Sequence, residues 1–255
     1  LYAIVGYPCG HSRSPAMYNR LFAHYGLGSF YTRIEWPSIG DVMREARRLA
    51  FRGLSITIPF KVDAVPCMDE VDEHATAIGA VNTAVMCGDR MYGYNTDWIG
   101  VRRPLEHLRG SRAVLLGAGG AAAAAAYALL ALDMDLTILN RTPQKAEELA
   151  ARFGCQSGSL EDIGRIPADV VVNATPVGME PDTRSILRGD ELPEGCTVFD
   201  LVYTPPETPL LREAKKAGCT TIPGTEMFVY QACEQFRLFT GIEVPEELVR
   251  EAIKG

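Results

Sequence analysis

Short hydrophobic runs alternate along the chain with segments in which hydrophobic residues recur every three or four positions. The runs are bounded by turn-forming residues and are typical of strands, whereas the longer period is typical of helices. Strands are predicted over residues 2–6, 30–34, 54–58, 80–87, 91–94, 113–116, 136–139, 170–173, 197–201 and 220–222. Helices are predicted from residue 14 onward, over 39–49 and 69–78, from the glycines at 117–120 to 132, and over 143–153, 209–217, 226–239 and 245–253.

For two of these helices the sequence allows more detailed predictions. Ser14 is expected to cap the first of them, with Pro15 in the first helical position. The helix over 39–49 is expected to bury an apolar face that consists of Val42, Met43, Ala46 and Leu49.

The pattern changes near residue 100. From there on, buried strands alternate regularly with helices, which indicates a parallel, doubly wound sheet of the Rossmann type. With 255 residues the chain is long enough for one large core or two modest ones. The sequence therefore predicts the α/β class, with a change of architecture near residue 100.

Composition narrows the possible functions. The formal net charge is -7, and an acidic chain without a basic cluster argues against a nucleic-acid partner. No apolar run approaches the roughly 18 residues of a membrane span, and residues 1–10 do not resemble a signal peptide. The 7 cysteines and 4 histidines show no metal-ligand spacing, so we expect no metal site and free thiols in a reducing, cytoplasmic compartment.

A glycine-rich turn follows the strand over 113–116 and opens the next helix. Its residues are Gly117, Ala118, Gly119, Gly120 and Ala121. The first glycine suits a tight turn, the second lets the backbone approach a pyrophosphate, and the helix N-terminus favours an anion. In this strand–turn–helix context the motif predicts dinucleotide binding, and the alternative is a glycine-rich turn that binds nothing.

The end of the next strand distinguishes NAD from NADP. An NAD site usually has a carboxylate there, but this chain has Asn140, Arg141 and Thr142, with Lys145 following. The two cations can pair with a 2′-phosphate, which a carboxylate would repel. The sequence therefore favours NADP as the cofactor.

Several polar segments lie at predicted strand ends and at the first helix start. In chain order they are HSRSP at 11–15, TIPFK at 57–61, GAVNT at 79–83 and YNTD at 94–97. Taken singly each is weak, because a capping loop, a solvated lysine or an ordinary Asn-Thr turn would explain it equally well.

Together with GAGGA, NRT, NATPVGM at 173–179 and GTEMFVYQ at 224–231, these segments resemble the shikimate dehydrogenase family over essentially the whole chain. The resemblance implies an N-terminal α/β substrate-binding and catalytic domain of residues 1–100 with 225–255. It also implies a Rossmann-like NADP-binding domain of residues 101–224, with the C-terminal helices returning to the first domain. The implied reaction is the reversible NADPH-dependent reduction of 3-dehydroshikimate to shikimate, in the chorismate pathway to aromatic amino acids.

The resemblance also assigns roles to individual residues. Lys61 and Asp97 fall on the catalytic lysine and aspartate of the family. Substrate-binding positions fall on Ser12, Ser14, Thr57, Asn82, Tyr203 and Gln231. Cofactor-binding positions fall on Gly117, Ala118, Gly119, Gly120, Ala121, Asn140, Arg141, Thr142, Lys145, Asn173, Thr175, Gly178, Met179 and Gly224.

Some positions depart from the common pattern of the family. Lys145 stands where arginine is frequent and cannot make a bidentate fork with phosphate. Tyr18 stands where histidine is often found and is not expected to be a ligand. Residues 224–228 look more like the version in fused dehydroquinate dehydratase–shikimate dehydrogenase proteins, and the first residue is Leu1 rather than Met. A monomer, a homodimer and the second half of such a fusion are therefore all open alternatives.

The proposed lysine–aspartate pair suits alcohol oxidation, since the cofactor takes a hydride and the protein must take a proton. The nearest rival is a quinate/shikimate dehydrogenase that uses NAD or NADP. A rival of another class is a regulator that binds nucleotide without catalysis, and it would be expected to lack Lys61 and Asp97. A third is another two-domain dehydrogenase, which would explain the cofactor turn but not the N-terminal segments.

Overall fold

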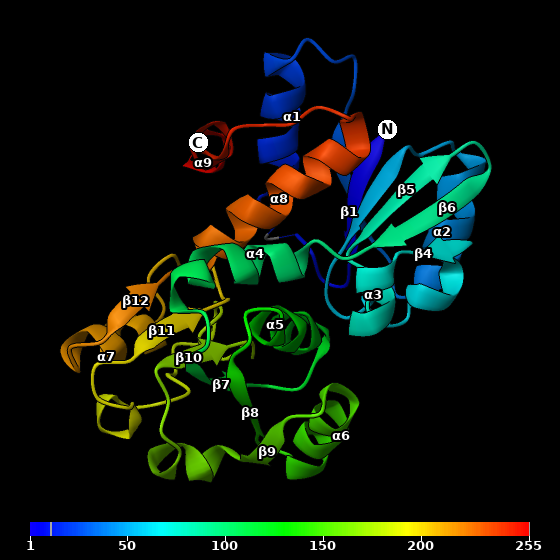
Figure 1. Ribbon diagram of the computed structural model, residues 1–255. Coiled ribbons are helices and arrows are strands. Elements are labelled where there is room, and N and C mark those ends of the chain that lie inside the picture. The colour runs from blue at the N-terminus through cyan, green and yellow to red at the C-terminus, as the bar shows by residue number, and fades with distance from the viewer. Residues whose placement is uncertain (11, 255) are drawn as a thin grey trace. The chain divides into compact units, whose positions relative to one another are not determined.

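The computed structural model describes residues 1–10 and 12–254, and its chain divides into two compact units (Figure 1). The first unit consists of residues 1–96 and 229–255, and the second of residues 97–228. His11, the first residue of the HSRSP segment, lies outside the described residues. No helix in the described part of the chain is both long and apolar enough to cross a bilayer.

The first unit is built on a six-stranded mixed sheet with strand order β2-β1-β3-β5-β6-β4. The strands are β1 (Tyr2–Gly6), β2 (Tyr31–Glu35), β3 (Gly53–Ile56), β4 (Glu70–Val71), β5 (Thr83–Cys87) and β6 (Arg90–Tyr94). The helices are α1 (Ser14–His24), α2 (Ile39–Arg48), α3 (Glu73–Ile78), α9 (Glu246–Lys254) and the C-terminal part of α8 (Gly224–Thr240). Strands β1, β2 and β3 are parallel, whereas β5 pairs antiparallel with both β3 and β6.

The C-terminal part of α8 packs against the beginning of this sheet. The hydroxyl of Tyr2 donates to the carbonyl of Phe239 at 3.0 Å, and the two rings lie 5.1 Å apart. Gly53 allows this approach, because a Cβ there would lie 2.5 Å from the Phe239 ring. The C-terminal part of α8 and the first strand, β1, are therefore part of the same core.

Helix α2 has the predicted amphipathic pattern. Ser38 caps it by accepting from the backbone N–H of Asp41, and the buried face holds Val42 and Met43. Leu49 was expected on that face, but the helix ends at Arg48 and Leu49 is 51% exposed.

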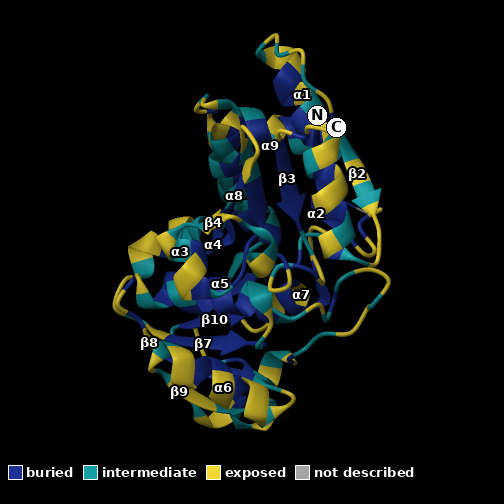
Figure 2. Cartoon of the chain, turned by 90° about the vertical axis from the view of Figure 1, so that its right-hand side faces the viewer, coloured by how far each residue is buried: buried dark blue, intermediate teal, exposed yellow. Residues whose placement is uncertain are grey.

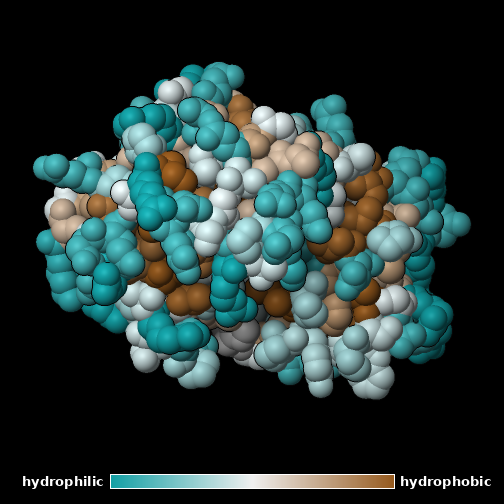
Figure 3. Space-filling view, turned by 90° about the horizontal axis from the view of Figure 1, so that it is seen from below, coloured by the Kyte–Doolittle hydropathy of each residue, from teal (hydrophilic) through white to brown (hydrophobic). Residues whose placement is uncertain are grey.

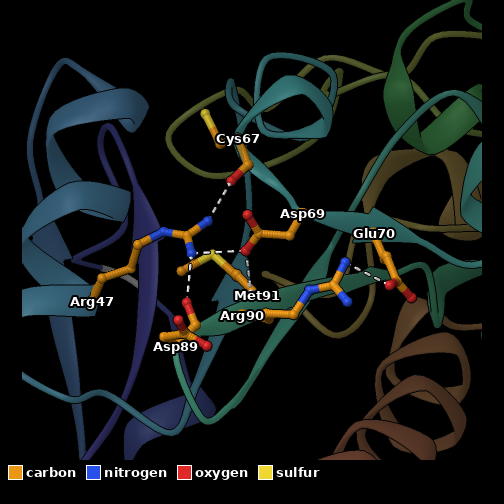
Figure 4. Close-up of polar contacts among 7 residues, drawn as sticks. All are labelled: Arg47, Cys67, Asp69, Glu70, Asp89, Arg90 and Met91. Carbon is orange, nitrogen blue, oxygen red and sulfur yellow. Dashed lines mark hydrogen bonds and ion pairs between the residues drawn. The ribbon is translucent and has the colours of Figure 1, made fainter.

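A polar cluster connects the end of α2 to the segment before β4 and to the β5–β6 turn (Figure 4). The Arg47 guanidinium donates to Asp69 at 2.7 Å and to the carbonyls of Asp89 and Cys67. Asp69 also accepts from the backbone N–H of Met91 at 2.6 Å, and this bond and the Arg47 bond lower the pKa of Asp69.

The second unit is a doubly wound sheet in which all strands are parallel, with strand order β12-β11-β10-β7-β8-β9. The strands are β7 (Arg112–Leu116), β8 (Asp135–Asn140), β9 (Gln156–Ser159), β10 (Val170–Asn173), β11 (Thr197–Asp200) and β12 (Thr220–Ile222). The helices are α4 (Asp97–Leu105), α5 (Gly120–Leu130), α6 (Pro143–Phe153), α7 (Pro209–Lys216) and the first residues of α8. This is the Rossmann order, and it reverses between β7 and β10.

Burial within this unit follows the sheet (Figure 2). Strands β7 and β10 are buried, as expected for parallel strands covered on both faces, and α6 alternates buried and exposed positions. In the view of Figure 3, hydrophobic side chains form separate patches broken by hydrophilic ones.

Two further predictions of local structure were wrong, and two elements were missed. Residues 69–78 do not form one helix: β4 comes first, and Asp72 then caps α3. Phe30 lies outside β2 and is 58% exposed. Helix α4 and strand β9 were not predicted, because the first contains Gly100 and Pro104 and the second is polar.

Candidate active site

Two loops of the first unit that hold residues predicted to bind substrate, the loops after β1 and β3, are held close together by the backbone. Gly6 ends β1, and a Cβ on it would lie only 2.4 Å from the Thr57 side chain. The backbone N–H of Thr57 donates to Val5, and that of Tyr7 donates to Ile58. Any larger residue at position 6 would clash with Thr57. Only glycine there therefore allows the segments that follow β1 and β3 to pack against each other.

Ser12 and Ser14 are both buried, at 3% and 4% exposure. The Ser12 hydroxyl accepts from the backbone N–H of Ser14 at 3.3 Å, and the Arg33 guanidinium donates to the Ser12 carbonyl at 2.7 Å. Ser14 is the first helical residue of α1 and not its cap, which is Arg13. The expectation that Ser14 caps the helix was therefore wrong, and its hydroxyl is not used for that purpose.

Lys61 is joined to the second polar segment through its backbone. Its carbonyl accepts from the N–H of Val81 at 2.8 Å, directly before Asn82. Lys61 is partly exposed, and Asn82 is 3% exposed. The first unit thus brings the exit of β3 and the start of β5 to one place.

Asn82 is held by a network of hydrogen bonds. Its amide oxygen accepts from the backbone N–H of Thr96 at 2.8 Å and from the Thr83 hydroxyl at 2.7 Å. Its amide nitrogen donates to the Thr96 hydroxyl, which also lies 3.4 Å from the Gln231 amide oxygen. Asn82 and Gln231, which were predicted on separate segments, therefore share Thr96.

Gln235 belongs to the same region and was not predicted. It is 2% exposed, and its amide nitrogen donates to the Thr83 hydroxyl at 2.6 Å. Its amide oxygen accepts from the hydroxyls of Tyr18 and Ser55. Its place one helical turn after Gln231 is the signal that could have found it. Tyr18 is fully buried and stacks on Tyr31, so it supports Gln235 from the core.

Asp97 begins the second unit as the first residue of α4 and is 4% exposed. A carboxylate is favoured at this end of a helix because the helix dipole is positive there. The residue directly before it is Thr96 of the Asn82 network.

The glycine-rich turn has the conformation that the sequence predicts. Gly117 has a φ of +113°, and its N–H donates to Leu139 of the neighbouring strand β8. Gly119 is the N-cap of α5, and a Cβ on it would meet no atom within 4 Å. Space is therefore available beside Gly119 for a ligand to approach the backbone at the N-terminus of α5.

The predicted phosphate clamp lies at the end of β8. Arg141, Thr142 and Lys145 are exposed, and the Asn140 side chain fixes the turn by donating to the Thr142 carbonyl at 3.0 Å. Within the described chain, neither Arg141 nor Lys145 pairs with a carboxylate, and no acidic residue lies in the first turn of α6. Both cations are therefore available to an anion.

The remaining predicted cofactor positions lie at the end of β10, in the loop that follows it and at the start of α8. Asn173 is fully buried, and its amide oxygen accepts from the N–H and hydroxyl of Thr175. Gly178 has a φ of +89°, and Met179 follows it. Gly224 contacts the backbone after β11 closely, because a Cβ there would lie 2.4 Å from the Val202 carbonyl oxygen. Nearby in the chain, the Tyr203 ring lies 5.0 Å from Phe228.

No group of three or more His, Cys, Asp or Glu side chains in the described part of the chain is placed to hold a metal ion.

Comparison with known proteins identifies the family. Three family models match: the shikimate dehydrogenase substrate binding domain at residues 4–84, shikimate / quinate 5-dehydrogenase at 101–180, and the shikimate 5'-dehydrogenase C-terminal domain at 224–254. A shikimate dehydrogenase (NADP(+)) of Pyrococcus abyssi is 39% identical, over 98% of this chain and 96% of its own. The chain belongs to the shikimate dehydrogenase family.

Solved structures of the family agree with the fold. A shikimate 5-dehydrogenase from Thermus thermophilus, in complex with NADP(H) and shikimate, matches with a TM-score of 0.92 and 38% identity, over 99% of this chain and 98% of its own. A quinate dehydrogenase from Corynebacterium glutamicum, in complex with NAD, matches with a TM-score of 0.91 and 34% identity, over 99% and 98%. The family therefore includes members that differ in substrate and cofactor.

Proposed function

We propose that this chain is an NADP-dependent oxidoreductase that reversibly reduces 3-dehydroshikimate to shikimate, in the route to chorismate and the aromatic amino acids. The observation that carries the proposal is the match over nearly the whole length of both chains to the Thermus thermophilus enzyme that binds NADP(H) and shikimate. The Pyrococcus abyssi relative, also an NADP(+) enzyme by name, supports it.

The unit of residues 1–96 and 229–255 is the substrate-binding unit in this proposal, and the unit of residues 97–228 binds NADP. The first contains the part matched by the substrate binding domain model. The second has the Rossmann strand order and the glycine-rich turn, and both features support the binding of a dinucleotide.

The residues present fit NADP. The turn from Gly117 to Ala121 would receive the pyrophosphate at the N-terminus of α5, where Gly119 leaves space. Arg141, Lys145 and Thr142 would hold the 2′-phosphate. Asn173, Thr175, Gly178 and Met179 would line the nicotinamide side, and Gly224 is a further cofactor-binding position of the proposal. When bound, the cofactor donates or accepts the hydride.

The substrate is a cyclic polyol acid, and the proposed ligands suit its groups. The hydroxyls of Ser12 and Ser14 would hold the carboxylate. Lys61, Asn82, Asp97 and Gln231 would hold the ring hydroxyls. Thr57 would also bind the substrate, and Tyr203 would lie near it. Buried polar ligands discriminate against an analogue that lacks a hydroxyl, because they are then left unpaired.

Lys61 is the proton-transfer group of the proposal, and Asp97 orients it. In the oxidation of shikimate, Lys61 would accept the hydroxyl proton, and in the reduction it would return that proton to the carbonyl oxygen. As an ammonium it would also stabilise negative charge that develops on this oxygen.

The test is a comparison of shikimate and quinate, each with NADP and with NAD, followed by the absorbance of the reduced cofactor at ~340 nm. Fast turnover with shikimate and NADP alone is expected. Equal or faster turnover with quinate or NAD would instead assign the chain to the quinate/shikimate alternative, which its similarity to the Corynebacterium glutamicum enzyme favours. No turnover in any combination would refute both.

We also expect a cytoplasmic monomer or homodimer. Its 7 cysteines are free thiols, which suits a reducing compartment. Light scattering on the purified chain distinguishes the two oligomeric states.

A further inference from the structure

Asp200, at the end of β11, is a buried carboxylate that accepts three hydrogen bonds. It is 0% exposed. Its Oδ1 accepts from the amide nitrogen of Asn173 at 2.9 Å and from the backbone N–H of Val202 at 3.1 Å. Its Oδ2 accepts from the Thr208 hydroxyl at 2.5 Å. The donors come from β10, from the loop after β11 and from the N-cap of α7, so one side chain joins three segments of the second unit.

The contacts continue from Asp200 to the glycine-rich turn. The amide nitrogen of Asn173 is bonded to Asp200, so its amide oxygen points the other way and accepts from the Thr175 hydroxyl at 2.7 Å. The Thr175 methyl group lies 3.1 Å from where a Cβ on Gly117 would be. The path Asp200–Asn173–Thr175 therefore ends against the turn at the point where the strand order of the sheet reverses.

A carboxylate at this position has a specific advantage over an amide. It can only accept hydrogen bonds, so it forces the Asn173 amide into the one orientation that presents an oxygen to Thr175. An asparagine at position 200 could donate as well, and both orientations of Asn173 would then be allowed.

The charge is also unfavourable for folding, which argues against a purely structural role. Burial raises the pKa of Asp200 to about 6, although the bonds from Thr208, Val202 and Asn173 favour the charged form. A neutral side chain of the same shape would avoid this cost.

We propose that Asp200 is a positioning residue for the cofactor: it acts through Asn173 to hold Thr175 against the Gly117 turn. The proposal rests on the proposed function, in which Asn173 and Thr175 line the nicotinamide side.

The test is a double-mutant cycle with Asp200→Asn and Thr175→Val, read as the dissociation constant of NADP by calorimetry and as the KM values for NADP and shikimate. Each single variant should weaken NADP binding by about 5- to 20-fold, as expected for the loss of one good hydrogen bond. The double variant should bind NADP as tightly as the single variant that has the lower affinity, because both changes break the same path. The KM for shikimate should stay within about twofold of the wild-type value.

Asp169→Asn is the matched control. Asp169 is also a carboxylate of the second unit, but it precedes β10 and pairs with Arg112 at the opposite end of that strand. This variant should bind NADP like the wild type. The proposal is overturned if the losses of NADP affinity in the two single variants multiply in the double variant. It is also overturned if Asp200→Asn loses thermal stability but binds NADP as the wild type does.

A second pair of variants covers the case in which Asp200→Asn does not fold. Thr208→Val removes the donor to Oδ2, and Thr208→Ser keeps it. Thr208→Val should weaken NADP binding and Thr208→Ser should restore it, and equal NADP binding in the two would contradict the proposal. Because NADP binding is measured without shikimate, a failure of this path is distinguishable from absent shikimate turnover, which would refute the proposed function instead.

Discussion

Lys61 has the most demanding role of any single residue in the proposed reaction. Its replacement by methionine keeps the length of the side chain and removes the group that transfers the proton. We expect kcat to fall by about 10²- to 10⁴-fold, the usual contribution of general acid–base catalysis, with a smaller change in the KM for shikimate. Steady-state kinetics of Lys61→Met, with the exposed Lys215→Met of α7 as control, test this. Near-normal turnover would remove Lys61 from the role.

Arg141 determines the choice between NADP and NAD if the clamp is as proposed. Arg141→Ala should raise the KM for NADP by about 10- to 100-fold, because a charge-assisted bond to phosphate is lost. The KM for NAD, which has no 2′-phosphate, should change little, so the preference for NADP should narrow. Arg165→Ala removes another exposed arginine of the same unit and serves as control. An unchanged ratio of the two KM values would place the 2′-phosphate elsewhere.

For individual residues, the sequence could indicate candidates for the site but not the hydrogen bonds that join them. Asn82 and Gln231 were recognisable from their motifs, yet the Thr96 hydroxyl between them was not. Gln235 was missed because its partners Thr83 and Ser55 are 152 and 180 positions away in the chain. Its place one helical turn after Gln231 could have pointed to the residue, but no local pattern encodes hydrogen bonds to partners so far away in the chain. The conformation of Gly117, by contrast, follows from its place between a strand and a helix.

At the scale of elements, the turn between β7 and α5 allows folding and binding to be separated. Gly117→Ala should destabilise the protein by about 1–3 kcal/mol, because its φ of +113° is strained for any residue with a Cβ. Gly119→Ala should leave the free energy of unfolding nearly unchanged, since its φ is -95° and nothing lies within 4 Å of the new methyl group. It should nevertheless weaken NADP binding, because the methyl group occupies the space proposed for the pyrophosphate.

Denaturant unfolding and NADP titration of both variants check this pair of predictions. Gly119→Ala with wild-type affinity for NADP would show that the pyrophosphate does not approach at Gly119. Gly117→Ala with wild-type stability would show that the turn can change its conformation at little cost.

Elements with a strong hydrophobic period were predictable, and elements that depend on tertiary contacts were not. The apolar strands β7, β8 and β10 were all expected close to their actual positions. Helix α4 was missed because Gly100 weakens the helical pattern. Its glycine is explained only by packing, since a Cβ there would lie 2.5 Å from the Met227 carbonyl oxygen. Strand β9 has no hydrophobic residue and forms because β8 offers it an edge.

At the scale of the whole molecule, the sheet of the second unit followed from the alternation of strands and helices, but that of the first unit did not. Its parallel strands and its antiparallel β5–β6 pair share one sheet, a mixture that no single period indicates. The return of the C-terminal helices was expected only from the family resemblance. The bond between Tyr2 and Phe239, which are 237 positions apart, shows why local patterns could not predict it.

The stability of the molecule should depend on pH through two carboxylates of opposite behaviour. Burial raises the pKa of Asp200 to about 6, so between pH ~4 and pH 6 the folded state keeps a proton that the unfolded chain has released. Its contribution to stability is therefore complete below pH ~4 and is lost as the pH rises through 6, by about 3 kcal/mol in all. The bonds from Arg112 hold the pKa of Asp169 at about 2, so its contribution is present above pH ~4 and is lost as the pH falls towards 2.

Urea unfolding of the wild type, Asp200→Asn and Asp169→Asn between pH ~4 and ~7.5 separates the two groups. Asparagine does not titrate, so the stability of Asp200→Asn relative to the wild type should rise by about 2.4 kcal/mol between the lower and the upper end of this range. Relative to the wild type, Asp169→Asn should be nearly constant over the same range, because Asp169 is ionised in both the folded and unfolded chain above pH ~5. A constant difference for Asp200→Asn as well would mean that Asp200 titrates at its ordinary value. The buried carboxylate would then cost the fold nothing, and the argument that it is kept for positioning would lose its energetic support.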